Sequence, residues 1–551
     1  MKLLKCALAL LSLALAAPSH AAPSHVTPPK LIIAIAVDQF GENLFERYRA
    51  SYTGGLRRLA DGATFTGFQS HAATETCPGH STILTGDHPA RTGIVANTWF
   101  DRASGFGRYC AGVPGSADPG ARGPQNLRVD TLGDWLKAAK PGARVYAISG
   151  KDRAAIMMGG HHADGVYWWN DAAGFGSSSF AGPVTPQAME AVTAFNANLF
   201  AAWAKAPPVL WPTQDFSPVC AALVKSYRYG DMELSGDVPP DTAKHVEDGP
   251  DYMKSSAFWV QVRSAPTFDP MTLDLATALV DAKHLGKGPA TDLLAISLST
   301  TDLIGHRYGQ GGAEMCAQVH ALDRSLGAFF GHIDALKIPY VVVLTADHGG
   351  SDAPERAGPP ATRIDGRRMV AELNTFLKLA LKLNSDPIGT EDPRTLWIKT
   401  GMSDLALKTQ VQDLALAWLN ARREVSHAYA AAEIAVAVPS KGKAPADLSQ
   451  VERFHESFDA DRSGDIEVAF VEGGTLSVPV HPGDTIASHG SPWDYDRRVP
   501  ILFWWPGVKA AKGAAAIETV DIAPTLAALV PLKAPPVDGR CVDLGGNCAP
   551  P

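Results

Sequence analysis

The chain has 551 residues, which is long enough for one large core with insertions or for two to three domains. Hydrophobic residues make up 46% of it and charged residues 19%, which excludes an intrinsically disordered chain. The formal net charge of −8 argues against general binding to nucleic acid or to an anionic membrane surface.

The first 21 residues have the pattern of a secretory signal peptide. Two lysines flank the start of an apolar run at residues 6–17, and residues 19–21 resemble a small-x-small cleavage site. The run is shorter than about 30 Å of hydrocarbon requires, which favours a signal peptide over a membrane anchor. We therefore expect residues 22–551 to be the mature chain, periplasmic or secreted, with no membrane anchor.

Six cysteines remain after such a cleavage, and an even number in an exported chain permits disulfide bonds. Cys541 and Cys548 flank a glycine-rich turn and form the best local pair. The sequence does not give the pairing of the other four, for which buried free thiols are the alternative. These four are Cys77, Cys110, Cys220 and Cys316.

Four aliphatic runs are typical of buried strands, and helical patterns such as residues 317–335 lie between them. Strands that alternate with amphipathic helices indicate an α/β sandwich with a central, mostly parallel sheet flanked by helices. The runs are LIIAIAVD at 31–38, DLLAISLSTTD at 292–302, YVVVLTADHG at 340–349 and VPILFWWPG at 499–507.

Three of these runs end in Asp or Asp-His. Ligand sites in open α/β sheets lie beyond the carboxyl ends of the strands. Residues 160–270 and 352–480 interrupt the strand–helix pattern, and we expect them to be insertions that cap this edge. The side chains expected to converge there are Asp38, Asp302, Asp347 and His348.

The stretch ATETCPGHSTILTG, residues 73–86, contains four potential nucleophiles within eight residues. Metal coordination or an adjacent base is needed to activate a hydroxyl nucleophile at neutral pH. The residue types alone do not show which one reacts. The four are Thr74, Thr76, Cys77 and Ser81.

Six acidic and histidine side chains are candidate metal ligands. Asp302 and His306 are four residues apart, so one helical turn places both on one face. Mixed Asp/His ligation suits Zn²⁺ better than Ca²⁺ or Mg²⁺, which prefer oxygen shells. Six ligands and one hydroxyl would serve two metal ions, an arrangement that suits phosphoryl transfer. The six are Asp38, Asp302, His306, Asp347, His348 and His489.

Together these motifs resemble the alkaline phosphatase superfamily. The closest likeness is to its exported bacterial threonine-nucleophile phosphatases, which are related to nucleotide pyrophosphatase/phosphodiesterases. The likeness covers about residues 30–540 and implies one alkaline-phosphatase-like catalytic domain at 22–551 with cap insertions. The motifs are VDQF, TETCPGHSTILTG, NTWFD, GKDR, STTDLIGHRYG, TADHGG, SHGSPWDYDRRVP and DIAPTLAAL, in this order.

The resemblance implies that Thr76 is the nucleophile and forms a phospho-threonine intermediate. Pro78 can open a helix, so Thr76 would lie at a helix N-terminus, where the dipole and free N–H groups favour a phosphate. Sulfatases of the same superfamily instead use a modified Cys or Ser in a C-x-P-x-R motif, which Cys77 does not match. By resemblance, one zinc ion would be held by Asp38, Thr76, Asp347 and His348, and the other by Asp302, His306 and His489.

The resemblance also bears on the choice between monoesters and diesters. Asn97 matches a phosphate-binding asparagine of the family, and Lys151 and Arg153 match the K-x-R pair of its monoesterase branch. A solvated turn is the alternative for GKDR. We expect an alkaline phosphatase acting on small-molecule phosphate monoesters. A nucleotide pyrophosphatase/phosphodiesterase is the main alternative, and a non-catalytic metal- or phosphate-binding protein is the third.

One further motif resembles a calcium loop. DADRSGDIE at 459–467 starts like an EF-hand, but Phe470 stands where a bidentate Glu is needed. It also matches an R-S-G-D segment of the family, which favours a structural turn over a Ca²⁺ site.

Overall fold

The computed structural model describes residues 28–230, 232–240, 252–399, 404–479, 481, 484–530 and 532–548. The expected signal peptide, residues 1–21, lies outside the described residues. Within the described ranges, no helix has the length and apolar character needed to cross a membrane.

A ten-stranded sheet forms the centre of the molecule, in the order β19-β2-β18-β11-β1-β10-β5-β6-β7, with β20 paired to β2. The strands β11, β1, β10, β5 and β6 are mutually parallel, as expected. The bounds are β1 Leu31–Val37, β2 Ala63–Phe68, β5 Val145–Ser149, β6 Gly165–Asn170, β7 Gly174–Gly176, β10 Asp292–Leu298, β11 Tyr340–Thr345, β18 Arg498–Trp504, β19 Ala511–Lys512 and β20 Ile517–Glu518.

The run at 499–507 is the exception among the four aliphatic runs. It forms β18, which is antiparallel to both β11 and β2. Its continuous apolar character reflects burial on both faces of the sheet, which an antiparallel strand inside a covered sheet shares with a parallel one.

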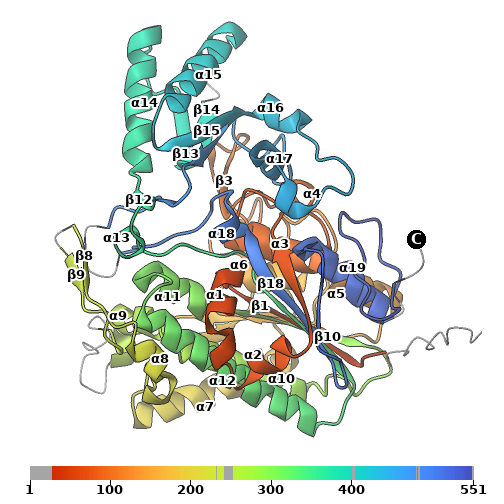
Figure 1. Ribbon diagram of the computed structural model, residues 1–551. Coiled ribbons are helices and arrows are strands. Elements are labelled where there is room, and N and C mark those ends of the chain that lie inside the picture. The colour runs from red at the N-terminus through yellow and green to blue at the C-terminus, as the bar shows by residue number, and fades with distance from the viewer. Residues whose placement is uncertain are drawn as a thin grey trace, which may run out of the picture.

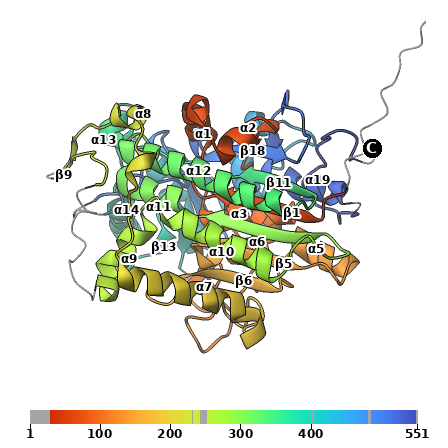
Figure 2. The ribbon, with the colours of Figure 1, turned by 90° about the horizontal axis from the view of Figure 1, so that it is seen from below.

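Helices cover both faces of the sheet, and the residues of β1 alternate between two cores. Ile33 and Ile35 pack toward α10 (Phe268–Ala282) and α12 (Ala313–Ala335), which lie in the lower part of Figure 1. Ile32 and Ala34 pack on the other face, against the core that includes α3 (Thr76–Thr85), α5 (Leu132–Ala139), α6 (Asp152–Gly159) and α19 (Ile522–Leu529). Figure 2 shows the helices α7, α10 and α12 along the sheet from below.

The two interrupting segments differ from each other. Part of 160–270 extends the central sheet as β6 and β7, and α7 (Pro186–Lys205) packs beside α10. The segment 352–480 contains a separate four-stranded sheet, here called the small sheet. Its order is β13 (Ile388–Asp392), β14 (Thr395–Ile398), β16 (Ile466–Phe470), β15 (Val425–Ala430).

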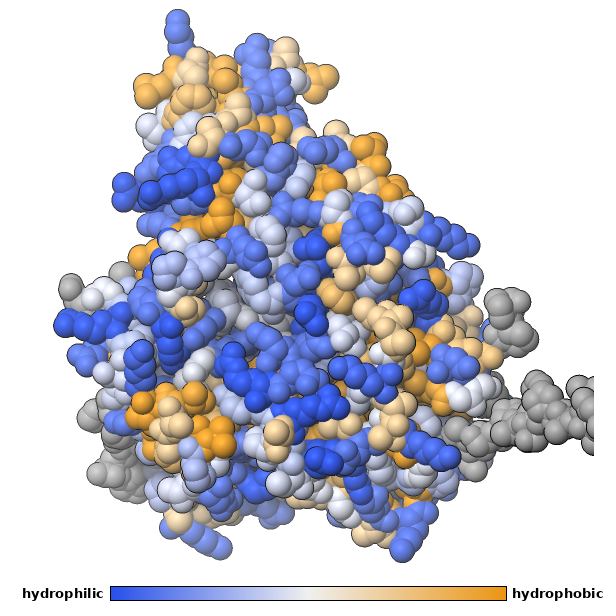
Figure 3. Space-filling model, in the orientation of Figure 1, coloured by the Kyte–Doolittle hydropathy of each residue, from blue (hydrophilic) through white to orange (hydrophobic). Residues whose placement is uncertain are grey.

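The small sheet has its own hydrophobic core. Helices α14 (Gly366–Leu381) and α15 (Leu405–Asn420) pack on it and stand at the top of Figure 1. Figure 3 shows a mostly hydrophilic face with apolar side chains gathered around this top region. Leu379 on α14 and Leu405 on α15 are each 77% exposed there.

The six cysteines form three disulfide bonds. The expected local pair Cys541–Cys548 is confirmed. The alternative of free thiols is wrong for the other four, which form Cys77–Cys110 and Cys220–Cys316. The bond Cys77–Cys110 attaches the start of α3 to the residue that follows β4 (Phe106–Tyr109).

Candidate active site

The side chains expected to form the site meet at the carboxyl edge of the central sheet. The strands β1, β10 and β11 end there, and the loop before α18 (Asp494–Arg497) reaches the same edge. The parallel arrangement explains this, because it brings the carboxyl ends of sequence-distant strands side by side. The residues are Asp38 after β1, Asp302 and His306 on α11 (Thr300–Tyr308) after β10, Asp347 and His348 after β11, and His489 in the loop.

One group of potential metal ligands consists of Asp302, His306 and His489. Their ligand atoms all lie within 4.8 Å of one another. Asp302 Oδ1 is 3.3 Å from His306 Nε2 and 3.5 Å from His489 Nε2. This group contains the same three residues that the resemblance implied for one zinc ion.

The second group consists of Asp38, Asp302 and His348, again within 4.8 Å of one another. Asp347 adjoins it, with Oδ2 at 3.3 Å from His348 Nε2. Asp302 therefore takes part in both groups, whereas the resemblance had implied a strict division between two ligand sets. A carboxylate has two oxygens and can serve both groups at once.

The three histidines present the same ring nitrogen to these groups. Nδ1 of His306, His348 and His489 donates to the backbone carbonyls of Ala487, Gly349 and Thr74, at 2.9, 2.8 and 2.8 Å. A carbonyl can only accept, so in the neutral ring Nε2 carries the lone pair. Metal-binding histidines are held in this way, because the second hydrogen bond fixes the tautomer and the ring orientation.

Several polar atoms inside the cluster lack hydrogen-bond partners. Asp38 Oδ1, Asp347 Oδ2 and His348 Nε2 are buried and unpaired. Such atoms are costly in a protein interior unless a cation or donor satisfies them. The Nζ atom of Lys151 lies 2.5 Å from Asp38 Oδ2 and 2.5 Å from Asp302 Oδ2, so the Lys151 ammonium lies between these two carboxylates. The unpaired donor atoms fit a divalent cation, and the mixture of imidazole and carboxylate suits zinc.

Burial shifts the pKa of three groups in the cluster, His348, His489 and Asp38. It lowers the pKa of His348, and it lowers that of His489 further with help from the neighbouring His348, so both rings are neutral near pH 7. Burial also raises the pKa of Asp38 well above its usual range, reinforced by the charges of Asp302 and Asp347. Three carboxylates crowded in one buried site are unfavourable without compensating cations.

Thr76 is the first residue of α3 and is 1% exposed. Its Oγ1 lies 3.4 Å from Nη2 of Arg153, near the start of α6. Helix α3 can approach β11 this closely because of Gly79, where a Cβ atom would lie 2.1 Å from the carbonyl oxygen of Asp347. The strand end and helix α3 are therefore in direct contact.

The start of α3 lies at Thr76, as expected, but fewer of its N–H groups are available than a bare helix start offers. Cys77 N donates to Asn97 Oδ1 at 2.8 Å, and Pro78 has no N–H. The N–H of Thr76 and the helix dipole remain to favour a phosphate there. The bond from Cys77 fixes the Asn97 amide so that its NH₂ group is left as a donor for a ligand.

Sequence reasoning missed Gln39, which organises the site. Its backbone N donates to Asp347 Oδ1 at 3.0 Å, and its side-chain Nε2 donates to Asp302 Oδ1 at 3.1 Å. Gln39 also has φ 63°, which is uncommon for a residue other than glycine. Its position directly after Asp38 at a strand end was the available signal.

Two further features lie beside the site. His80 is held inside the core, with Nδ1 bonded to the carbonyl of Thr76 at 2.8 Å and Nε2 to Ser297 Oγ at 2.9 Å. In the 459–467 segment, Asp459 Oδ1 accepts from the backbone N of two following residues, and its carboxylate pairs with Arg128. This is a hydrogen-bonded turn, as the family segment suggested.

An open groove of about 680 Å³ reaches the site at Lys151 and Arg153. Its other lining residues include Arg122, Trp169 and Arg263. β5 and β6 end beside it, so it continues along the same edge of the sheet.

Comparison with known proteins identifies the family. The model of the type I phosphodiesterase / nucleotide pyrophosphatase family matches residues 32–492, which is most of the chain and includes every candidate metal ligand. The chain belongs to this family.

Several similar proteins are alkaline phosphatases by name. Alkaline phosphatase PhoK from Sphingomonas sp is 41% identical over 540 residues, which cover 94% of this chain and 91% of the relative. Alkaline phosphatase PhoD from Zymomonas mobilis is 38% identical over 537 residues, covering 94% and 88%. The crystal structure of alkaline phosphatase PafA matches with a TM-score of 0.75 and 25% identity, covering 94% and 99%. The expected alkaline phosphatase superfamily and its α/β fold are thereby confirmed.

Proposed function

We propose that the chain is an exported, zinc-dependent alkaline phosphatase that hydrolyses small-molecule phosphate monoesters through a phospho-threonine intermediate at Thr76. The observation that carries this proposal is the position of Arg153 and Asn97 beside Thr76, at the edge of two histidine–aspartate groups. The names of the relatives support it, and the three disulfide bonds suit a compartment outside the cytoplasm.

Asp38, Asp347 and His348 with Thr76 would hold one zinc ion, and Asp302, His306 and His489 the other. When bound, the two ions would supply positive charge that makes the attacking hydroxyl more acidic and stabilises the departing alcohol oxygen. The donor atoms are held ready for this by the three Nδ1–carbonyl bonds and by Gln39.

In the first step, Thr76 Oγ would attack phosphorus and the bond to the alcohol oxygen would break, leaving phospho-threonine and the alcohol. In the second, water would attack the same phosphorus, releasing inorganic phosphate and restoring the Thr76 hydroxyl. Arg153 can hold two of the three non-bridging phosphate oxygens, and Lys151 can act as a nearby point charge, while the Asn97 amide can donate to the third. A monoester carries more charge on these oxygens than a diester, so the clamp favours monoesters.

The groove beyond Lys151 and Arg153 gives the alcohol part of the substrate room to lie along the sheet edge. Its lining is largely polar, with Arg122 held by Asp152 at 2.9 Å. A site open on this side suits alcohols of varied size.

A phosphodiesterase is the second candidate, because the family model is named for that activity. The deciding experiment measures kcat/KM of the zinc-loaded mature protein for p-nitrophenyl phosphate and for bis-p-nitrophenyl phosphate. We expect a ratio well above one. The double variant Lys151→Ala/Arg153→Ala should lose far more monoester than diester turnover. A wild-type ratio well below one would assign the chain to the phosphodiesterases. If neither substrate is hydrolysed, the remaining candidate is a non-catalytic binding protein.

A further inference from the structure

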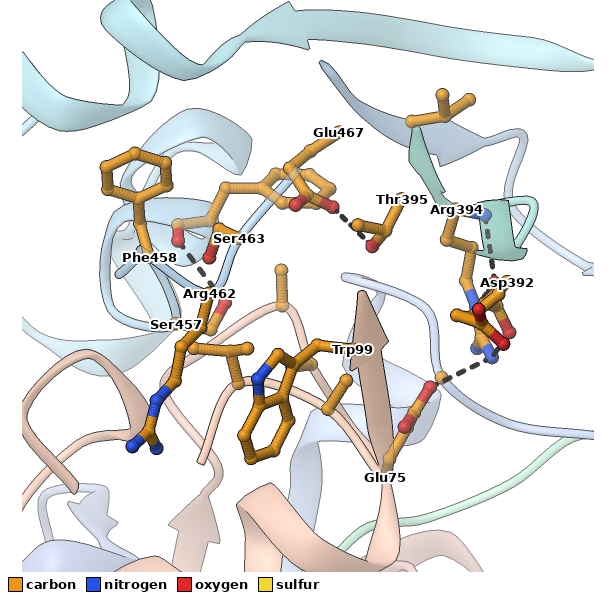
Figure 4. A pocket seen from close by; sticks show the side chains of 18 of the residues that line it. Glu75, Trp99, Asp392, Arg394, Thr395, Ser457, Phe458, Arg462, Ser463 and Glu467 are labelled. Carbon is orange, nitrogen blue, oxygen red and sulfur yellow. Dashed lines mark hydrogen bonds and ion pairs between the residues drawn. The ribbon is translucent and has the colours of Figure 1, made fainter. Parts of the chain in front are cut away.

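Arg394 belongs to the small sheet, but its side chain enters the active edge of the central sheet. It lies in the turn between β13 and β14, where Asp392 holds it with bonds of 2.8 Å to Nε and 2.7 Å to Nη2. Figure 4 shows it between Asp392 and Glu75, on one wall of a cavity of about 60 Å³.

The guanidinium of Arg394 contacts both sides of the site. Nη2 lies 3.1 Å from Glu75 Oε1, directly before Thr76, and Nη1 donates to the carbonyl oxygen of His489 at 2.7 Å. The other carboxylate oxygen of Glu75 accepts from Asn97 N at 2.8 Å. Arg394 is thus linked through Glu75 to Asn97, whose amide is the proposed hydrogen-bond donor to the phosphate. It is linked directly to His489, a candidate metal ligand.

The local backbone is shaped around this arginine. Gly490 follows His489 with φ 99°, and a Cβ atom there would lie 1.4 Å from Nη1 of Arg394. A side chain at position 490 therefore cannot coexist with the bond from Arg394 to His489. The planar fork of arginine can serve two acceptors in fixed directions, which the single ammonium of lysine cannot do in the same way.

Removing the guanidinium would leave the partly buried Glu75 carboxylate without the cation that holds it, so it would be free to move. Such a movement would loosen Asn97, because Glu75 fixes its backbone N. The carbonyl of His489 would lose its donor in the same substitution.

We propose that Arg394 is a positioning residue that orients Asn97 through Glu75 and His489 through its backbone carbonyl. The position of the small sheet against the central sheet is thereby coupled to the phosphate-binding and metal-binding parts of one site. This inference rests on the proposed phosphatase function.

The test begins with Arg394→Gln and a matched control. Loss of a residue that orients a ligand typically costs about 10–100-fold in activity or metal affinity, and we expect such a loss in kcat/KM for p-nitrophenyl phosphate. The control is Arg102→Gln. Arg102 also joins the central part to the small sheet, through Asp465 at 3.1 and 3.2 Å, with similar burial and no bond to Glu75 or His489. It should change kcat/KM by about twofold or less.

A double-mutant cycle with Asn97→Ala separates positioning from general loss of stability. If Arg394 acts through Asn97, then Arg394→Gln costs a much smaller factor when Asn97 is already alanine. The same factor in both backgrounds, or an equal loss in Arg102→Gln, overturns this part of the inference. Glu75→Gln, which keeps Arg394, should show the same non-additivity with Asn97→Ala and serves if Arg394→Gln does not fold.

Zinc retention against a competing chelator tests the contact with His489 without relying on turnover. Arg394→Gln should release zinc at lower chelator concentration than the wild type, whereas Asn97→Ala should not. If Arg394→Gln retains zinc as well as the wild type does, the inference that Arg394 orients His489 is wrong. A wild type that fails to hydrolyse p-nitrophenyl phosphate refutes the proposed function instead, and the zinc measurement still tests the contact.

Discussion

At the residue scale, the structure distinguishes among the four potential nucleophiles of the 73–86 stretch. Cys77 is committed to a disulfide bond, Thr74 donates to Ser491 O at 2.8 Å, and Ser81 donates to Pro78 O at 2.7 Å. Of the four, Thr76 is the one whose hydroxyl lies against Arg153. This removes the basis for a sulfatase-like role of Cys77.

Replacing Thr76 by alanine should abolish turnover and leave the fold intact. Loss of a nucleophile that works within a concerted site reduces kcat by roughly 10⁴-fold or more. The rate of p-nitrophenyl phosphate hydrolysis, zinc content and circular dichroism are the measurements. Thr76→Ser, which keeps a hydroxyl, should recover part of the rate. A near-normal rate in Thr76→Ala would remove this residue from the mechanism.

The sequence predicted where the candidate ligands meet, because strand-end aspartates and histidines follow a general rule for parallel sheets. It did not predict Gln39 or the bond from Cys77 N to Asn97. Both depend on a backbone conformation or a side-chain orientation that no local pattern encodes. Arg394 was missed for a different reason: it is more than 300 residues from Glu75 in the chain, and only the packing of the small sheet brings it there.

At the scale of elements, β16 of the small sheet carries a half-buried acid, Glu467, that makes stability depend on pH. Burial raises the pKa of Glu467 from 4.5 to about 7, although Thr395 Oγ1 and Gly464 N donate to it at 2.8 and 3.0 Å. The folded state therefore holds this proton at pH values where the unfolded chain has released it. The stabilisation is complete below about pH 4.5 and is lost as the pH rises through about 7.

Glu467→Gln should remove this dependence, because glutamine stays neutral. The wild type should lose up to about 1.4 kcal/mol of unfolding free energy per pH unit from this group between pH 5 and 7. The variant should lack that slope and be the more stable of the two at pH 8. Urea unfolding at several pH values measures it. Glu433→Gln, at an exposed position, is the control, and parallel curves for Glu467→Gln and the wild type would contradict the expectation.

The architecture of the small sheet was only partly predictable. The sequence indicated an interruption at 352–480 but not a sheet with its own core, because short strands such as β13 and β14 lack a long apolar run. The structure of the segment 160–270 was harder to predict. Its strands β6 and β7 continue the central sheet after a helix, and only the pairing of β6 with β5 and of β7 with β6 shows that they belong to this sheet.

At the scale of the whole molecule, the buried cluster of carboxylates and unpaired atoms links metal content to stability. Ligands that bind only the folded state stabilise it, by about 4 kcal/mol when present at 1,000 times their dissociation constant. Treatment with a chelator should therefore abolish turnover and lower the melting temperature, and zinc should restore both.

The melting temperature provides the control for this prediction. Thr76→Ala should still be stabilised by zinc although it is inactive. Asp302→Asn should be stabilised much less, because Asp302 belongs to both ligand groups. If neither chelator nor zinc changes the melting temperature of the wild type, the cluster holds no metal.

The disulfide bond Cys77–Cys110 has a practical consequence for anyone who makes the protein. One of its sulfur atoms belongs to the residue next to the proposed nucleophile. A reducing cytoplasm keeps thiols from pairing, so material produced there would lack this link, whatever its purity. Yield of protein and yield of working enzyme would then diverge, and expression hosts should be ranked by specific activity after export.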